Sequence, residues 1–219
     1  MKRYRKVRIG LAVAGSVAIL SGAGTAYAHS PWSVTAGTQT SGSVPYSATA
    51  TGTSSAPAIA FTIGASNMTC NSSSAAGDVT LGATPGFFAS ITDFTLHSCL
   101  MEGILPMELS VSATPANPWA MRITNDAIGG VSPVRLYDIH GHMRDIGTGG
   151  WTCGFDVDGT IDGTFDSGSQ QLAVSATSSG LVVSNVTGGC FGWISNGNSM
   201  TFAGDYDVTN PVGPFHVDH

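Results

Sequence analysis

Three potential metal ligands alternate in the segment 137–142, which reads Tyr-Asp-Ile-His-Gly-His. Asp138, His140 and His142 are separated by single residues, so on an extended strand their side chains would project from one face. Imidazole and carboxylate groups in such an arrangement bind zinc or copper. Gly141 could instead break the strand into a turn, which would leave two ordinary solvent-exposed histidines. A metal site and a polar loop are therefore the two interpretations of this segment.

His29 offers a second route to a metal. If the chain is cleaved after Ala28, the α-amine of His29 becomes free beside its own imidazole, and the two nitrogens form a bidentate chelator. The pair resembles the histidine brace of copper-dependent polysaccharide monooxygenases, which are also secreted β-sandwiches. A brace needs one more histidine, for which the chain offers His97, His140, His142 and His216. The alternative is that His29 merely follows a cleavage site.

Two aspartates suggest weak calcium binding. The segment 156–162 reads Asp-Val-Asp-Gly-Thr-Ile-Asp, so Asp156 and Asp158 occupy the first two ligand positions of a calcium loop. The match then fails, because Ile161 and Ser167 stand where such a loop needs a glycine and an acidic residue. Strict alternation explains the same aspartates as the solvent face of a strand. We expect the strand face and keep calcium as the alternative.

No sequence motif assigns a catalytic residue. The chain contains neither G-x-S-x-G nor H-E-x-x-H, and Glu102 and Glu108 are its only glutamates. Serine, histidine and aspartate are so plentiful that a triad can be drawn from many combinations, so none of them is informative. We therefore expect a non-catalytic binding or structural role, with a secreted metalloprotein or copper enzyme as the alternative.

The tryptophans could form stacking platforms for sugars, and the chain has Trp32, Trp119, Trp151 and Trp193. Trp119 is in phase with Met121 and Ile123, as a core residue would be. Trp151 and Trp193 lie near cysteines, where aromatic rings commonly pack on disulfides. Core packing is the favoured interpretation, and an extracellular or cell-envelope polysaccharide is the partner that exposed aromatic rings would suit.

The first 28 residues predict a secretory signal peptide. A basic segment, 1–8, precedes a short apolar run, 9–19, and the segment 26–28 is an Ala-Tyr-Ala cleavage site. The apolar run is shorter than the ~20 residues that a membrane-spanning helix needs, and nothing later in the chain resembles such a span. We expect residues 29–219 to be a single secreted, extracellular domain.

The cleaved domain would be strongly acidic. Outside residues 1–8 the chain holds three cations, Arg122, Arg135 and Arg144, against all 14 carboxylates, and it has no lysine there. Tracking the phosphates of a nucleic acid, or docking on an anionic membrane, needs many more positive charges. Lysine-dependent Schiff-base and P-loop chemistry is excluded as well.

An even set of cysteines in an exported chain predicts two disulfides rather than free thiols, and the set is Cys70, Cys99, Cys153 and Cys190. Their wide spacings match no zinc-ligand pattern. Three connectivities can be drawn. We favour Cys70 with Cys99 and Cys153 with Cys190, because pairing neighbours closes two separate loops.

A β-sheet must hold these candidate residues, because helical periodicity is nearly absent and strand alternation recurs. The clearest strand is 155–166, where apolar residues or glycine alternate with aspartate or threonine. A turn at 166–169 and a returning strand at 172–175 complete a hairpin. Further strands are expected at 45–51, 58–63, 79–81, 90–98, 107–112, 119–124, 134–139, 181–185 and 200–208.

The number of these strands predicts an all-β fold, an antiparallel sandwich or barrel of roughly ten to twelve short strands. A chain of this length forms one such domain without a boundary inside it. The Ser- and Thr-rich stretch 38–57 could be a flexible arm, but we favour an edge strand over 44–51.

Several short segments together resemble a widespread group of small actinobacterial secreted proteins, hypothetical exported β-rich proteins with two disulfides. The resemblance covers most of residues 30–210. It is carried by Met68-Thr69-Cys70, Ser98-Cys99, Pro118-Trp119, Trp151-Thr152-Cys153, Asp158-Gly159-Thr160, the segment 189–197 and Met200-Thr201-Phe202. It implies an exported, disulfide-linked β domain and supplies no activity, substrate or catalytic residue.

Overall fold

The structure, a computed structural model, describes residues 32–53, 56–84, 87–147 and 152–218. The expected signal peptide and His29 lie outside these residues. The regular elements are β1 (Trp32–Ala36), β2 (Gly42–Thr51), β3 (Ile59–Ile63), β4 (Ser66–Thr84), β5 (Phe87–Met101), β6 (Leu105–Val111), β7 (Trp119–Ile123), β8 (Val131–Asp145), β9 (Gly154–Asp166), β10 (Gln171–Ser179), β11 (Leu181–Thr187), the 3-10 helix η1 (Cys190–Gly192), β12 (Ser199–Thr209) and β13 (Phe215–Asp218). No helix in the described part of the chain has the length and apolar character that crossing a membrane requires.

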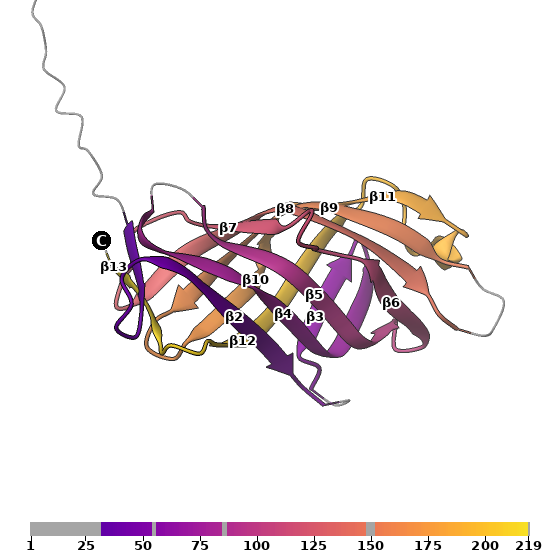
Figure 1. The fold of residues 1–219 in the computed structure, drawn as a ribbon. Helices are drawn as coiled ribbons and strands as arrows, with labels where there is room; N and C mark the ends of the chain where they lie inside the picture. The colour runs from indigo at the N-terminus through magenta and orange to yellow at the C-terminus, as the bar shows by residue number, and fades with distance from the viewer. Residues whose placement is uncertain (1–31, 54–55, 85–86, 148–151, 219) are drawn as a thin grey trace, which may run out of the picture.

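The strands form one antiparallel sheet that closes on itself (Figure 1). Among the described residues the ring has eight positions: β4, β2 with β3, β12, β10 with β11, β9, β8, β7 with β6, and β5, which pairs with β4 again. Five long strands fill one position each, and three positions are each shared by two short strands placed end to end. The all-β antiparallel fold is thus confirmed, in its closed form rather than as two separate sheets.

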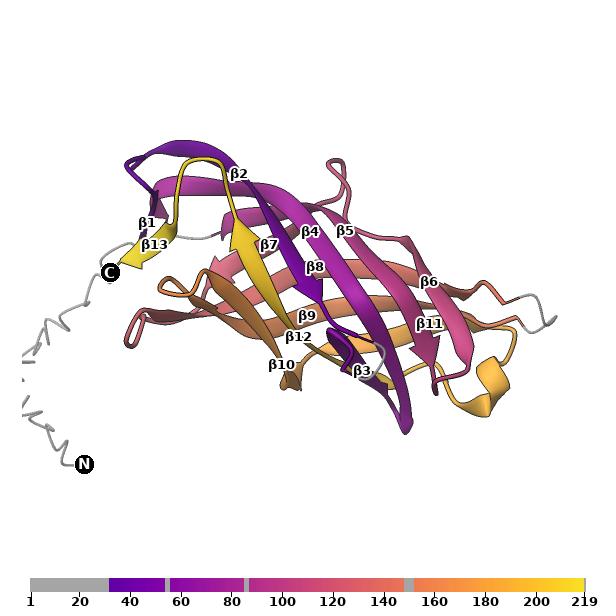
Figure 2. The same cartoon turned by 90° about the horizontal axis from the view of Figure 1, so that it is seen from below.

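The ring strands share a common tilt, as Figure 2 shows from below. Tilt is what allows a sheet of this width to close, because it staggers the hydrogen-bond register around the ring. β1 and β13 pair with each other and extend the sheet beyond the ring at the end where β4 finishes. They lie at the end of the molecule that holds the C-terminus (Figure 2).

Alternation decides which side chains fill the ring. In β9, Phe155, Val157, Ile161 and Phe165 are buried, whereas the aspartates between them reach the outer face. β2 follows the same rule, with Val44, Tyr46, Ala48 and Ala50 buried. These buried side chains belong to one continuous core inside the ring. Removing their apolar surface from water is the main favourable contribution to folding.

Some strands differ from those that the sequence predicts. β4 runs from 66 to 84 rather than over 79–81, because 71–78 reads Asn-Ser-Ser-Ser-Ala-Ala-Gly-Asp and offers no large side chains to mark alternation. The strand expected at 44–51 exists as β2, but it is not an edge strand, since β4 pairs with one side of it and β12 with the other. β1 and β13 were not expected from the pattern.

Both disulfides have the predicted connectivity. Cys70 and Cys99 are directly opposite each other on β4 and β5. Cys153 precedes β9 and is joined to Cys190 in η1, so this bridge fastens the η1 loop to the sheet. All four sulfurs belong to residues that are almost fully buried.

The close contact of Gly77 on β4 with the backbone of β5 predicts that this glycine is sensitive to substitution. A Cβ added at Gly77 would lie 1.8 Å from the backbone oxygen of Ser90, so Gly77→Ala must push the two strands apart. We expect a loss of about 2 kcal/mol in the free energy of unfolding, measured by urea denaturation. Thr80→Ala, at an exposed position on the same strand, should change it by less than about 0.5 kcal/mol. Equal stability of the two variants would refute the predicted contact.

Candidate functional site

The wall of the ring is interrupted where β6 and β7 share one position. On β5, Ile91 pairs with β7 and Cys99 pairs with β6, so no described strand pairs with the stretch 92–98 on that side. On β8, pairing passes from Tyr137 with β7 to His142 with β6. The position shared by β2 and β3 is nearly continuous, because the two strands pair with residues only two apart on β4. β10 and β11 leave residues 201–203 of β12 unpaired between them. We call the interruption the β6/β7 gap.

A cavity of about 70 Å³ lies inside the ring behind this gap. Side chains from all the strands that border the gap line it: Phe94 and Leu96 of β5, Leu109 of β6, Trp119 of β7, and His140 of β8. The opposite wall is built from Phe61, Phe202 and other apolar residues. The cavity therefore has an apolar lining and extends to the border of the gap.

Aromatic rings connect the gap to the far wall. Phe94, which is half-buried, lies 4.9 Å from Trp119 and 6.4 Å from Phe202, measured between ring centroids. Phe202 in turn meets Phe61 edge-to-face at 5.0 Å. Such contacts favour a fixed aromatic wall. The half-burial of Phe94 and Leu96 places both apolar side chains where interior and solvent meet.

The interior holds few polar groups, and those that are bonded stay neutral. The Tyr206 hydroxyl donates a 2.9 Å hydrogen bond to Ser73 Oγ, which donates at 2.8 Å to the backbone oxygen of Thr95. Burial raises the pKa of Tyr206 far above its usual range, because the charged phenolate would be poorly solvated there. The interior therefore suits an uncharged, apolar occupant.

Ser132 Oγ is buried with no hydrogen-bond partner among the described residues, and the same holds for Trp119. Only 5% of Trp119 is exposed, yet its indole Nε1 has no hydrogen-bond acceptor among the described residues. A buried donor without an acceptor is rare in folded proteins and costs free energy.

The predicted metal face on β8 does not form as the extended-strand interpretation requires. The register of β8 against β9 shifts between Leu136 and Ile139, and Asp138 adopts a left-handed φ of 57°. His140 Nδ1 donates to the backbone oxygen of Asp138 at 2.9 Å, and its ring approaches Trp119 at 6.2 Å. No group of three His, Cys, Asp or Glu residues is placed to hold a metal ion in the part of the chain that the structure describes. The copper hypothesis for His29 lies outside that part and stays a prediction.

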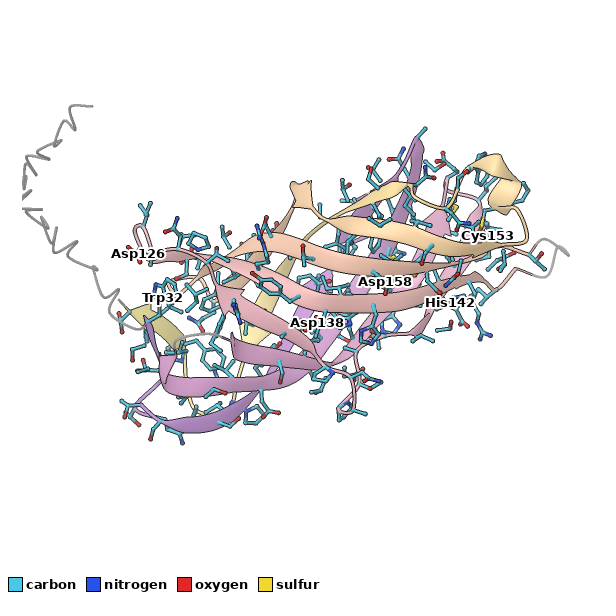
Figure 3. The ribbon with its side chains drawn as sticks, turned by 90° about the horizontal axis from the view of Figure 1, so that it is seen from above. Trp32, Asp126, Asp138, His142, Cys153 and Asp158 are labelled. Atoms are coloured by element: carbon cyan, nitrogen blue, oxygen red, sulfur yellow. A yellow bond between two sulfur atoms is a disulfide. The ribbon has the colours of Figure 1, made fainter. Side chains whose placement is uncertain are left out.

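His142 instead joins a polar cluster on the outer face of β8 and β9, where Figure 3 labels it near Asp158. His142 Nδ1 donates to Asp156 Oδ1 at 2.5 Å, and Asn185 Nδ2 donates to Asp156 Oδ2 at 2.6 Å. These two hydrogen bonds, first from Asn185 and then from His142, lower the pKa of Asp156. Asp158 accepts from Ser184 at 3.5 Å. The two aspartates thus lie on the solvent face of the strand, as expected, and calcium binding stays untested.

The tryptophans have different surroundings. Trp119 is in the core, as predicted, and Trp151 lies outside the described residues. Trp32 donates to Asp126 at 3.3 Å at the other end of the sheet (Figure 3). Trp193 is half-buried and stacks on Phe191, with ring centroids 4.7 Å apart. Phe191 is 43% exposed, so this pair presents an aromatic surface next to the Cys153–Cys190 disulfide.

Sequence reasoning did not identify the gap residues Phe94, Leu96, Leu109 and Gly141. The available signal was the segment 112–118, which reads Ser-Ala-Thr-Pro-Ala-Asn-Pro. Its prolines lack the N–H that a central strand needs, so it must leave the wall. The chain resumes as β7 beside the same two strands.

The Asp156 cluster predicts a pH-dependent contribution to stability. The folded-state pKa of Asp156 is below its unfolded value of 3.8, so its stabilisation is complete above that value and is lost as the pH falls through the lower folded-state pKa. We expect Asp156→Asn to cost less than about 1 kcal/mol at pH 7 and progressively less below pH ~4. Urea denaturation between pH 2 and ~7 measures this difference. Thr164→Ala, an exposed change on the same strand, should give a pH-independent difference. A constant cost for Asp156→Asn would contradict the assignment.

Three comparisons with known proteins found no match for this chain. No protein-family model matches the chain, no curated protein matches it, and no solved structure matches it.

Proposed function

We propose that this protein is a non-catalytic binding protein of the extracellular space, and that it holds a small apolar ligand inside its closed sheet. The observation that carries the proposal is the apolar cavity behind the β6/β7 gap. Pockets for small molecules are concave and mostly apolar, with a few placed polar groups. The cavity matches this description in its apolar lining, to which Trp119 contributes.

The setting of the domain supports an extracellular role. Two disulfides are typical of proteins that work in an oxidising compartment. The predicted signal peptide would export the chain, and membership of the actinobacterial secreted group would agree with this. All three arginines outside the first eight residues are engaged with a carboxylate or an aromatic ring on the surface.

Filling the cavity tests the proposal. Ala75 lines the cavity on β4 opposite Phe94, so the larger side chain of Ala75→Leu would occupy the ligand's space. We expect xenon, followed by xenon NMR, to bind the wild-type protein and to bind the variant about tenfold more weakly. Ala60→Leu makes the same change at an exposed position on β3 and should leave binding unaltered. Absence of binding to the wild type, or equal binding to both variants, would refute the proposal.

Contact with a polysaccharide is a second candidate function. One observation favours it: Phe191 is exposed and stacked on Trp193, in a loop fastened by a disulfide. A fixed aromatic face can stack on a sugar ring at little cost in conformational entropy.

Truncating Phe191 tests this second function. We expect Phe191→Ala to lower retention of the protein on insoluble chitin or cellulose by about tenfold, since most of the exposed ring is lost. Ile128→Ala, which removes an exposed apolar side chain elsewhere, should have no effect. If the wild type is not retained, or the Phe191 variant is retained equally well, the aromatic pair has no such role.

A further inference from the structure

Resting on the second candidate function, we infer that the loop between β11 and β12 is a preformed subsite for an uncharged glycan. Residues 188–198 form this loop, the η1 loop, and its exposed Phe191 ring stacks on the apolar face of a sugar ring. Three features of the described residues support the inference: a backbone held in a costly conformation, contacts that fix the aromatic pair, and the charges on and around the loop.

The backbone of the η1 loop has an unusual conformation. Five consecutive residues, 188–192, have positive φ angles between 37° and 76°, and two of them, Cys190 and Phe191, are not glycine. A left-handed conformation costs free energy for such residues, so it persists only where the surrounding structure holds it. Strain of this kind is concentrated at sites that bind ligands or react. Here it includes Phe191, which is 43% exposed.

Several contacts fix the aromatic pair in place. Phe191 stacks on Trp193, whose backbone N–H donates to the backbone oxygen of Cys190 at 2.9 Å. The backbone oxygen of Trp193 accepts from Ser66 Oγ, at the start of β4, at 3.4 Å. Cys190 is joined to Cys153, which Figure 3 labels. An aromatic surface that is already ordered loses little conformational entropy when a ligand stacks on it.

Gly188 positions the loop against the segment that precedes β9. A Cβ added at Gly188 would lie 1.7 Å from the backbone oxygen of Thr152, so the loop approaches this closely only because the residue has no side chain. The next residue, Gly189, has a similar φ, 73° against 68°, but no atom lies within 4 Å of its Cβ position. The two glycines therefore separate a displacement of the loop from the cost of its left-handed backbone.

The loop itself is uncharged. The chain has no charged residue between Asp166 and Asp205, which includes all of the η1 loop. Apart from the Trp193 indole, the polar side chains of residues 188–198 are hydroxyl and amide groups. Such groups suit the hydroxyl and amide groups of a neutral glycan, because hydrogen bonds between neutral partners need no compensating charge.

The charged groups beside the loop are carboxylates. Asn67, one residue beyond the contact of β4 with the loop, donates its backbone N–H to Glu102 Oε1 at 2.6 Å. On β11, which leads into the loop, Asn185 Nδ2 donates to Asp156 Oδ2 at 2.6 Å. All three described arginines contact other groups. An anionic glycan would therefore meet like charge on both sides of the loop without a compensating arginine.

Matched polymers test the charge preference. Hydroxyethyl and carboxymethyl cellulose share one glucan backbone, and glycol and carboxymethyl chitin share another, so the pair is used whose parent polymer retains the wild type. In affinity electrophoresis at pH ~8 and low ionic strength, we expect the anionic polymer to bind at least about fivefold more weakly than the uncharged one. Glu102→Gln/Asp156→Asn should narrow this difference and leave binding of the uncharged polymer unaltered.

Glycine variants test the positioning of the loop. We expect Gly188→Ala to bind the uncharged polymer about tenfold more weakly, and Gly189→Ala to stay within about twofold of the wild type. Adding Phe191→Ala to Gly188→Ala should lower binding little further, because the ring is already displaced. Urea denaturation shows whether each variant folds. Cys153→Ala/Cys190→Ala releases the loop without a steric clash and should reproduce the loss of binding.

The outcomes distinguish the inference from the function on which it rests. If the wild type is retained and Phe191→Ala is not, but the anionic polymer binds as well as the uncharged one, or Gly188→Ala and the disulfide variant both bind normally, the inference is overturned and the polysaccharide function stands. Equal losses in Gly188→Ala and Gly189→Ala overturn the role of Gly188. If neither chitin nor cellulose retains the wild type, the polysaccharide function fails and the inference falls with it.

Discussion

The strands at the two edges of an open sheet leave rows of backbone N–H and C=O groups unpaired, and here the pairing of β4 with β5 removes both edges of the ring at once. Once the ring is closed, every second side chain of each strand must point inward, because successive residues of a strand face opposite sides. The interior is thereby filled by the apolar half of each alternating strand, and the arginine–carboxylate pairs lie on the outer face. His140 departs from this division, because it also lines the cavity.

Closure of the ring also explains why the β6/β7 gap matters. A chain that leaves the ring must be replaced by another strand at the same position, and β7 replaces β6 only after an interval along β5 and β8. The backbone is irregular on both sides of that interval: Ser98 and Asp138 have left-handed φ angles of 53° and 57°. Left-handed conformations cost free energy for residues other than glycine, so the surrounding sheet must hold them in place. The gap is thus a stable feature of the fold, maintained by pairing on either side of it.

The sequence predicted those parts of the fold in which local pattern and tertiary position agree. β9 alternates so regularly that its boundaries, its inner face and its outer aspartates could all be predicted, and neighbouring cysteines indicated the disulfides. β4 could not be delimited, because its serines and alanines show no contrast between the two faces. The metal motif on β8 assumed a regular strand, whereas β8 has a register shift beside Asp138 that depends on how β8 meets β9. The gap was beyond local pattern altogether, since it arises from where two strands end relative to two others.

The cavity itself follows from side-chain size on one wall. A ring of fixed strand number and tilt encloses a fixed volume, which inward side chains must fill. Along β4 the inward positions opposite Leu96 and Phe94 are Ser73 and Ala75, the smallest residues that a strand can use without glycine's flexibility. The rings of Phe61 on β3 and Phe202 on β12 reach across the interior. They do not fill all of the volume left by these small side chains, so space remains beside Ala75. Leucine or valine there would give a better-packed and more stable core, because lost packing contacts at a void cost free energy. Small residues at these positions therefore lower stability where the described interior meets the β6/β7 gap.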